Sequence, residues 1–251
     1  MSYVEAVYSI WLREFKVFTR EKERAVSSVV TPIIWLVAFG AGLGSAISIG
    51  DTNYQTFIFP GILGMNVLFT SMFYGMYIVW DKKMDLLKEM LIAPVPRYVV
   101  FIGKALGGLT NVLFQMIILL VVGALFMGIP LNIASFILTL ASALMLGFVC
   151  VCLGLFIGSK LSSPDAFSLI MSFVMWPMFL TSGALYPISN LPSYLQAVVQ
   201  LNPMAYGVDL MRGVILGSFT FGFWLDVAVL ALAGLAVFFV GQRSFDKMSL
   251  G

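Results

Sequence analysis

The chain has 251 residues, of which 61% are hydrophobic and 10% are charged, and its formal net charge is +2. Soluble domains carry about 25% charged residues, so this chain has too few polar side chains to cover the exterior of a water-soluble globule. The composition excludes a soluble enzyme, a nucleic-acid-binding domain and a disordered chain. It indicates an integral membrane protein folded as a single domain over residues 1–251.

The reactive side chains are few. Histidine is absent, which excludes an imidazole proton relay and a histidine-based metal site. Cys150 and Cys152 are two residues apart in one apolar run, where helical side chains point in different directions, so a disulfide between them is not expected. We expect no catalytic residue, metal site or cofactor in this chain.

The N-terminal segment lacks the central apolar block of a cleavable signal peptide. Apolar side chains instead recur at helical spacing, while Glu5, Arg13, Lys16 and Arg20 fall largely off their stripe. The stripe comprises Val4, Val7, Tyr8, Trp11, Phe15 and Phe18. This pattern predicts an amphipathic helix within residues 1–26, which lies in the cytoplasmic membrane interface or packs on the spans as an ordinary helix.

Six apolar segments approach the length of about 20 residues that a helix needs to cross a bilayer. They are residues 27–47, 57–80, 105–127, 133–157, 166–186 and 221–240. The apolar stretch 191–216 differs, because Pro192, Pro203 and Gly207 interrupt it and it holds Asp209 and Arg212. The predicted fold is therefore all-α, with six transmembrane helices and a re-entrant helical hairpin at residues 187–216 between spans five and six.

Positive charge predicts the orientation of these spans. Of the 14 Lys and Arg residues, all except Arg212 fall in the termini and in the loops that alternate with them. Because positively charged loops stay in the cytoplasm, we expect both termini to be cytoplasmic in a multi-pass protein of the plasma (inner) membrane.

The spans lack the groups that drive transport directly. No Asp, Glu, Lys or Arg lies deep in a predicted span, which argues against an ion-coupled carrier and a carboxylate-lined cation pore. The chain has no GxxxxGK[ST] motif, so it does not bind ATP through a P-loop of its own. If ATP drives transport, another subunit supplies the nucleotide site.

Milder polar residues form stripes on spans two, three and five. These residues are Asn66 and Thr70, then Gly108, Asn111 and Gln115, and finally Ser168 and Ser172. They either form hydrogen bonds between helices or line a mostly apolar substrate route beside Met65, Met72, Phe73 and Met76. The pairs Gly40/Gly44, Gly103/Gly107 and Gly154/Gly158 have the GxxxG spacing of closely packed helices.

The segment between spans two and three, residues 81–97, predicts a short cytoplasmic helix. Met84, Leu87 and Leu91 form its apolar edge, and Pro94 and Pro96 end it. Such a helix either docks into a groove of a partner or is a plain loop between spans.

The outer hairpin carries its own helix signals. Asn202 is an expected N-cap, with Pro203 at the first helical position. Asp209 and Arg212 lie three residues apart on that helix, a spacing at which they could pair. The hairpin either shields the external mouth of a route or serves only for packing.

Several short motifs occur in the order found in one transporter family. They are FPG at 59–61, EMLIAPVP at 89–96, SG at 182–183 before YP at 186–187, and LNP at 201–203 followed by Tyr206, Arg212 and Gly213. In these motifs and in its topology the chain resembles, over nearly its whole length, the permease subunits of type-2 ABC exporters. Its short loops resemble the drug and nodulation-oligosaccharide branch of that family.

The resemblance implies a homodimer of this chain bound to two copies of an ABC ATPase subunit, which binds ATP and Mg²⁺. It places the coupling helix on residues 81–97, with contacts to the ATPase from Lys83, Leu87, Glu89, Met90 and Leu91. It also implies a substrate path between the two permeases, lined chiefly by spans two and five. The candidate path residues are Asn66, Thr70, Phe73, Tyr77, Ser172 and Trp176, and the external re-entrant residues are Asn202, Pro203, Asp209 and Arg212.

The leading hypothesis is therefore a permease that exports an amphiphilic substrate, such as a drug, a lipid-like molecule, a glycolipid or an oligosaccharide. The apolar spans favour drug or lipid-like molecules. A passive channel or membrane scaffold working without ATP is the alternative, and the absence of histidine and acidic clusters argues against a membrane enzyme.

Overall fold

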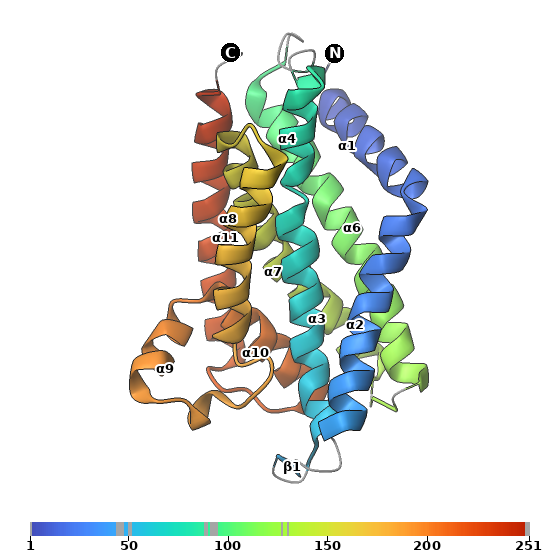
Figure 1. The fold of residues 1–251 in the computed structure, drawn as a ribbon, viewed down its shortest axis with the longest axis vertical. Helices are drawn as coiled ribbons and strands as arrows, with labels where there is room; N and C mark the ends of the chain where they lie inside the picture. Colours follow the sequence, from blue (N-terminus) through green and yellow to red (C-terminus); the bar gives the residue numbers. More distant parts are fainter. Residues whose placement is uncertain are drawn as a thin grey trace.

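The computed structural model describes residues 2–43, 48–49, 52–87, 90, 95–126, 128–129 and 131–248. It is an elongated bundle in which most helices run along the long axis (Figure 1). In chain order the elements are α1 Tyr3–Arg20, α2 Lys22–Leu43, β1 Ser48–Ile49, β2 Thr52–Asn53, α3 Tyr54–Phe73, α4 Met76–Lys83, α6 Arg97–Phe126, α7 Ile133–Lys160, α8 Pro164–Leu180, η1 Ile188–Asn190, α9 Ser193–Gln200, α10 Pro203–Leu216 and α11 Phe223–Asp246.

The predicted helical fold is confirmed, but the count of six spans is not. Within the described residues, four helical stretches are long and apolar enough to cross a membrane: Tyr54–Lys83, Arg97–Phe126, Ile133–Lys160 and Phe223–Asp246. The segments expected as spans one and five contain shorter apolar stretches, Val29–Phe39 and Pro164–Leu180. The all-α expectation also missed one small antiparallel pairing, in which Ser48 faces Asn53 and Ile49 faces Thr52.

The centre of the bundle is α3, which packs against α2, α6, α7, α8 and α10. Its close contact with α7 depends on glycine. A Cβ atom at Gly75 would lie 2.0 Å from the Gly154 carbonyl oxygen, and one at Gly158 would lie 2.4 Å from that of Gly75. The predicted packing role of Gly154 and Gly158 is thus confirmed, whereas Gly44 lies outside the described residues.

The predicted N-terminal helix is present, although it is shorter than residues 1–26. A capping box between Ser2 and Glu5 starts α1, and the helix ends at Arg20, with only Glu21 between it and α2. Its apolar side lies along α6, where Trp11 Nε1 donates a hydrogen bond to Thr110 Oγ1 at 2.9 Å. Gly103 permits this contact, because a Cβ atom there would lie 2.7 Å from the Ile10 side chain.

Both ends of the described chain lie at one end of the bundle (Figure 1). The Tyr3 ring lies 6.3 Å from that of Tyr98, and Arg97 donates to the Met248 carbonyl oxygen at 2.8 Å, so the start of α6 contacts both. The helices α9 and α10 lie at the opposite end. We call these the terminal end and the hairpin end.

At the hairpin end, α10 begins as predicted. The Asn202 side chain accepts a hydrogen bond from the Met204 N–H group at 3.0 Å, and Pro203 is the first helical residue. Gly217 ends the helix with a φ of 74°, in the left-handed region that favours glycine. Most of α10 is buried against α3, α7 and α11, so the apolar side chains of this 14-residue helix are covered by the rest of the bundle.

Asp209 and Arg212, whose spacing allows them to pair, each have other hydrogen-bond partners in the structure. Asp209 instead accepts hydrogen bonds from the Thr220 and Phe221 backbone N–H groups, at 2.8 and 2.9 Å. Arg212 donates to the Gly183 carbonyl oxygen at 2.8 Å and lies 4.2 Å from the centre of the Phe57 ring. Each side chain therefore holds a different loop against the bundle.

Candidate functional site

A cavity of about 610 Å³ lies over α3, which runs between α2 and α8 (Figure 1). Side chains from α2, α3, α4, α6 and α8 line it. They are Ser27, Thr31, Pro32, Trp35, Met65, Asn66, Phe69, Thr70, Phe73, Met76, Gln115 and Trp176. None of these residues is charged, so the cavity offers hydroxyl and amide groups on a mostly apolar and aromatic wall.

Four of the six predicted path residues line this cavity: Asn66, Thr70, Phe73 and Trp176. The predicted polar stripes of spans two and three also meet there, because Thr70 Oγ1 donates to Gln115 Oε1 at 2.7 Å. The Phe69 and Trp176 rings meet edge to face at 5.4 Å, which joins α3 to α8.

The other two predicted path residues lie elsewhere. Ser172 is exposed, and its hydroxyl donates to the Ser168 carbonyl oxygen at 2.9 Å, as expected when a helical serine satisfies itself on its own backbone. Tyr77 donates to the Glu21 carboxylate and lines a second cavity of about 450 Å³ beside α1 and α4. Met76 borders both cavities.

The contribution of α2 to the cavity was not predicted. Ser27, Thr31 and Trp35 are spaced four residues apart, so they share one face of the helix. That spacing is the signal in the sequence that would have indicated a lining face.

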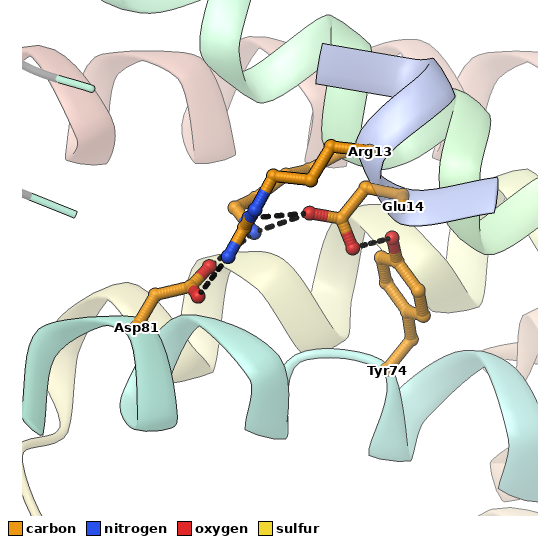
Figure 2. A network of polar contacts seen from close by, with 5 residues as sticks. Arg13, Glu14, Tyr74 and Asp81 are labelled. Carbon is orange, nitrogen blue, oxygen red and sulfur yellow. Dashed lines mark hydrogen bonds and ion pairs between the residues drawn. The ribbon is translucent and has the colours of Figure 1, made fainter. Parts of the chain in front are cut away.

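A buried network of charges ties α1 to α4 and α6 at the terminal end (Figure 2). Arg13 Nη2 lies 2.9 Å from Asp81 Oδ1, and Arg13 Nη1 lies 3.1 Å from Glu14 Oε1. Lys104 Nζ bridges the two acids, at 3.0 Å from Glu14 Oε1 and 2.5 Å from Asp81 Oδ2. The Tyr74 hydroxyl donates to Glu14 Oε2 at 2.7 Å.

The network is neutral overall, with two positive and two negative side chains. Lys104 is fully buried, and such a charge is tolerated only when opposite charges and hydrogen bonds surround it. Burial alone lowers the pKa of Arg13, but the hydrogen bond and charge of Asp81 outweigh it, so that pKa is raised above its ordinary value and Arg13 stays charged.

Over the described residues 81–87, the chain is not the one continuous helix predicted within residues 81–97. The helix α4 ends at Lys83, and Asp85 has a φ of 57°, which breaks the helical path. Lys82 Nζ anchors this end of α4 by donating to the Ser159 and Leu161 carbonyl oxygens, at 2.5 and 3.1 Å, where α7 ends.

The predicted coupling residues occupy different environments. Leu87 is 2% exposed and packs with Phe101 and Phe245, so it holds the segment against the bundle and is not available to a partner here. Met90 is half-buried in the same cluster. Lys83 and Met84 are exposed, and Lys83 lies 5.2 Å from the Trp80 ring centre. Glu89 and Leu91 lie outside the described residues.

The described residues contain no group of three or more His, Cys, Asp or Glu side chains placed to hold a metal ion. Cys150 and Cys152 are both buried as free thiols on α7. The site therefore consists of a binding cavity and a buried network of charges that joins helices.

The described chain thus combines an uncharged, partly apolar cavity with four helices long and apolar enough to cross a membrane, as expected of a membrane transport protein. The chain belongs to the family described as "ABC-2 type transporter", whose pattern matches residues 5–216.

Two relatives in Escherichia coli (strain K12) show how similar the chain is to known members. The "Inner membrane transport permease YadH" is 29% identical over 248 residues, covering 95% of this chain and 91% of that protein. The "Probable multidrug ABC transporter permease YbhR" is 25% identical over 201 residues, covering 77% of this chain and 54% of that protein.

Proposed function

We propose that this chain is the membrane-spanning subunit of an ATP-driven exporter that moves an amphiphilic substrate outward. Two copies of the chain assemble with two ATPase subunits, which bind ATP and Mg²⁺. The observation that carries the proposal is the uncharged cavity of about 610 Å³ over α3, in a chain whose family consists of ABC-2 type transporters.

The proposed topology has six crossings, with α2 and α8 as the two shorter ones. The terminal end then faces the cytoplasm, in an inner membrane, and the α9–α10 hairpin enters the membrane from outside without crossing. The distribution of Lys and Arg supports this orientation, since Arg97, Lys104 and Lys160 lie at the terminal end whereas Arg212 lies at the hairpin end.

The proposed coupling element is the segment 81–97 together with α1. Force applied by an ATPase to the exposed Lys83 and Met84 would reach α3 directly, because α4 continues α3 beyond a short turn at Tyr74 and Gly75. Asp81 of α4 would carry the same movement to α1 and α6 through its ion pairs with Arg13 and Lys104. Glu89 and Leu91 remain proposed contacts of the ATPase on the basis of the family resemblance.

The proposed substrate path includes the cavity, with Asn66, Thr70, Phe73 and Trp176 as binding residues. Its aromatic and methionine wall suits the apolar part of an amphiphile, and its hydroxyl and amide groups suit uncharged polar groups. The name of the relative YbhR refers to multidrug transport, which agrees with drug-like substrates. The exposed apolar side chains Ile34 of α2 and Phe173 of α8 flank this face and would meet a second copy or lipid.

The test is substrate-stimulated ATPase activity of the complex with its ATPase, reconstituted in liposomes. Paired panels of uncharged amphiphiles and lipid-linked sugars are compared. Trp176→Ala and the double variant Thr70→Val/Gln115→Leu are expected to weaken stimulation, raising the half-maximal substrate concentration about tenfold for a loss of about 1.4 kcal/mol.

Ser172→Ala is the matched control, because Ser172 lies on α8 outside the cavity. Its stimulation is expected to equal that of the wild type. Equal stimulation in all variants would overturn the assigned path. Sustained flux through the isolated chain without ATPase would overturn the exporter in favour of a passive channel.

A further inference from the structure

A second buried acidic site lies at the hairpin end, where α10 meets the first turn of α11. Asp209 of α10 and Asp226 of α11 are 1% and 0% exposed. The Asp209 carboxylate accepts hydrogen bonds from the Thr220 and Phe221 backbone N–H groups, at 2.8 and 2.9 Å. These bonds hold the loop that joins the two helices, so the Asp209 side chain stabilises the position of that loop.

Asp226 has no comparable donors. Neither of its carboxyl oxygens has a hydrogen-bond partner among the described residues when the group is taken as ionised. Asp226 follows Phe221, whose N–H group binds Asp209, by five residues, and α10 packs against α11, so the two carboxyl groups lie at one helix contact and interact electrostatically. Two ionised carboxylates close together and shielded from water repel strongly, and a buried ion without a partner carries a large desolvation cost.

The neighbouring groups do not relieve this repulsion. On α10, Tyr206 uses its hydroxyl hydrogen to bond the Gln200 carbonyl oxygen at 2.8 Å, and Arg212 balances only one of the two carboxylates while donating to Gly183. On α3, the Tyr54 hydroxyl donates to the Leu185 carbonyl oxygen. The helices α6 and α7 also pack on α11, and their charged residues, Arg97 and Lys104 of α6 and Lys160 of α7, lie at the other end of the bundle.

We propose that Asp209 and Asp226 form a proton-binding carboxyl pair. Asp226 takes one proton from water and donates its O–H group to the Asp209 carboxylate, which keeps its backbone hydrogen bonds. With Arg212, the site is then electrically neutral. The shared proton fastens the hairpin helix α10 to the start of α11, and its loss at alkaline pH leaves two carboxylates that push these helices apart. In the orientation proposed above, this site responds to external pH.

Infrared spectroscopy of the purified chain tests the pair directly, without requiring transport. A protonated carboxyl group has a carbonyl stretch distinct from that of a carboxylate, and it shifts on exchange into D₂O. We expect this band at neutral pH in the wild type and its loss in Asp226→Asn. Asp165→Asn changes an exposed carboxyl at the start of α8 and is expected to keep the band. Absence of an Asp226-dependent band at neutral pH would overturn the proposal.

Thermal unfolding across pH provides a second readout. The native pair binds a proton that an exposed aspartate in the unfolded chain, with a pKa near 3.9, does not bind at neutral pH. The wild type therefore becomes less stable as pH rises, and Asp226→Asn, whose amide donates to Asp209 without titrating, is expected to flatten that slope. Asp209→Asn is expected to flatten it only in part, because burial of Asp226 still opposes its ionisation after the neighbouring carboxylate is removed.

Adding divalent cations distinguishes a proton-binding site from a metal-binding site. Mg²⁺ or Ca²⁺ between the two carboxylates would raise the melting temperature of the wild type and not of Asp226→Asn, and that result would overturn the proton in favour of a cation. An unchanged melting temperature on addition of either ion, together with the pH slope, supports the shared proton.

Discussion

Lys104 Nζ lies 2.5 Å from Asp81 Oδ2, so the contact between α6 and α4 joins a fully buried ammonium group to a carboxylate on a residue that is 6% exposed. The same ammonium group reaches Glu14 of α1 at 3.0 Å. One side chain thus links three helices at the terminal end. Because these helices surround the segment proposed to contact an ATPase, the network defines which elements move together.

Lys104→Met is expected to destabilise the protein by about 3–5 kcal/mol, because it leaves Glu14 and Asp81 buried with only Arg13 as a positive partner. Chemical unfolding in detergent measures the loss. The double variant Lys104→Met/Asp81→Asn restores neutrality with Arg13 and Glu14, so it is expected to recover part of the stability. Lys160→Met, at an exposed position, is the control, and an equal loss there would contradict the assignment.

Gly154→Ala is expected to disrupt the contact between α7 and α3. The added Cβ atom would lie 2.5 Å from the Met72 carbonyl oxygen, and because the Cβ atom is fixed to the α7 backbone and the oxygen belongs to the α3 backbone, the helices must separate. A loss of about 1–3 kcal/mol follows from such overpacking. The helical Gly42 is the matched site, since a Cβ atom there meets nothing within 4 Å. Gly42→Ala should therefore leave the melting temperature unchanged or raise it, and similar losses at both sites would refute the packing argument.

Asn202 combines a helix cap with a link to α8. Its Oδ1 atom caps α10, while its Nδ2 atom donates to the Met178 carbonyl oxygen at 2.6 Å and to Thr181 Oγ1 at 3.0 Å. Asn202→Ala removes all three bonds and is expected to cost about 2–3 kcal/mol of unfolding free energy. Asn202→Ser keeps a capping oxygen, so its loss of unfolding free energy should be smaller. The difference between the two variants measures the contribution of the cap. Equal losses would mean that the cap contributes nothing.

The sequence predicted what depends on local pattern and missed what depends on contacts between distant residues. Capping by Asn202 and close packing at Gly154 follow from residue types at known offsets. Glu14 was not singled out, although it lies three residues after Trp11 on the apolar stripe of α1, where a carboxylate signals a buried partner. Its partners, Tyr74 and Lys104, are 60 and 90 residues away along the chain, so no local rule could pair them.

The same limit applies to the segment after α4. The apolar spacing of Met84 and Leu87 predicted a short helix that either docks its apolar edge on a partner or is a plain loop between spans. The structure places Leu87 in the core with Phe101 and Phe245, which belong to α6 and α11. An amphipathic pattern shows that one face is covered, but it does not show whether the same chain or another one covers it.

Met84 and Leu87 therefore allow docking to be separated from folding. Met84 is 63% exposed, so Met84→Asp is expected to change the unfolding free energy by no more than about 0.5 kcal/mol. If this surface contacts the ATPase, the variant weakens co-purification and lowers coupled ATPase activity, because a charge enters an apolar contact. Leu87→Ala, in contrast, is expected to cost about 2–5 kcal/mol through a cavity in the core. Normal coupling by a stably folded Met84→Asp protein would place the contact elsewhere on the terminal end.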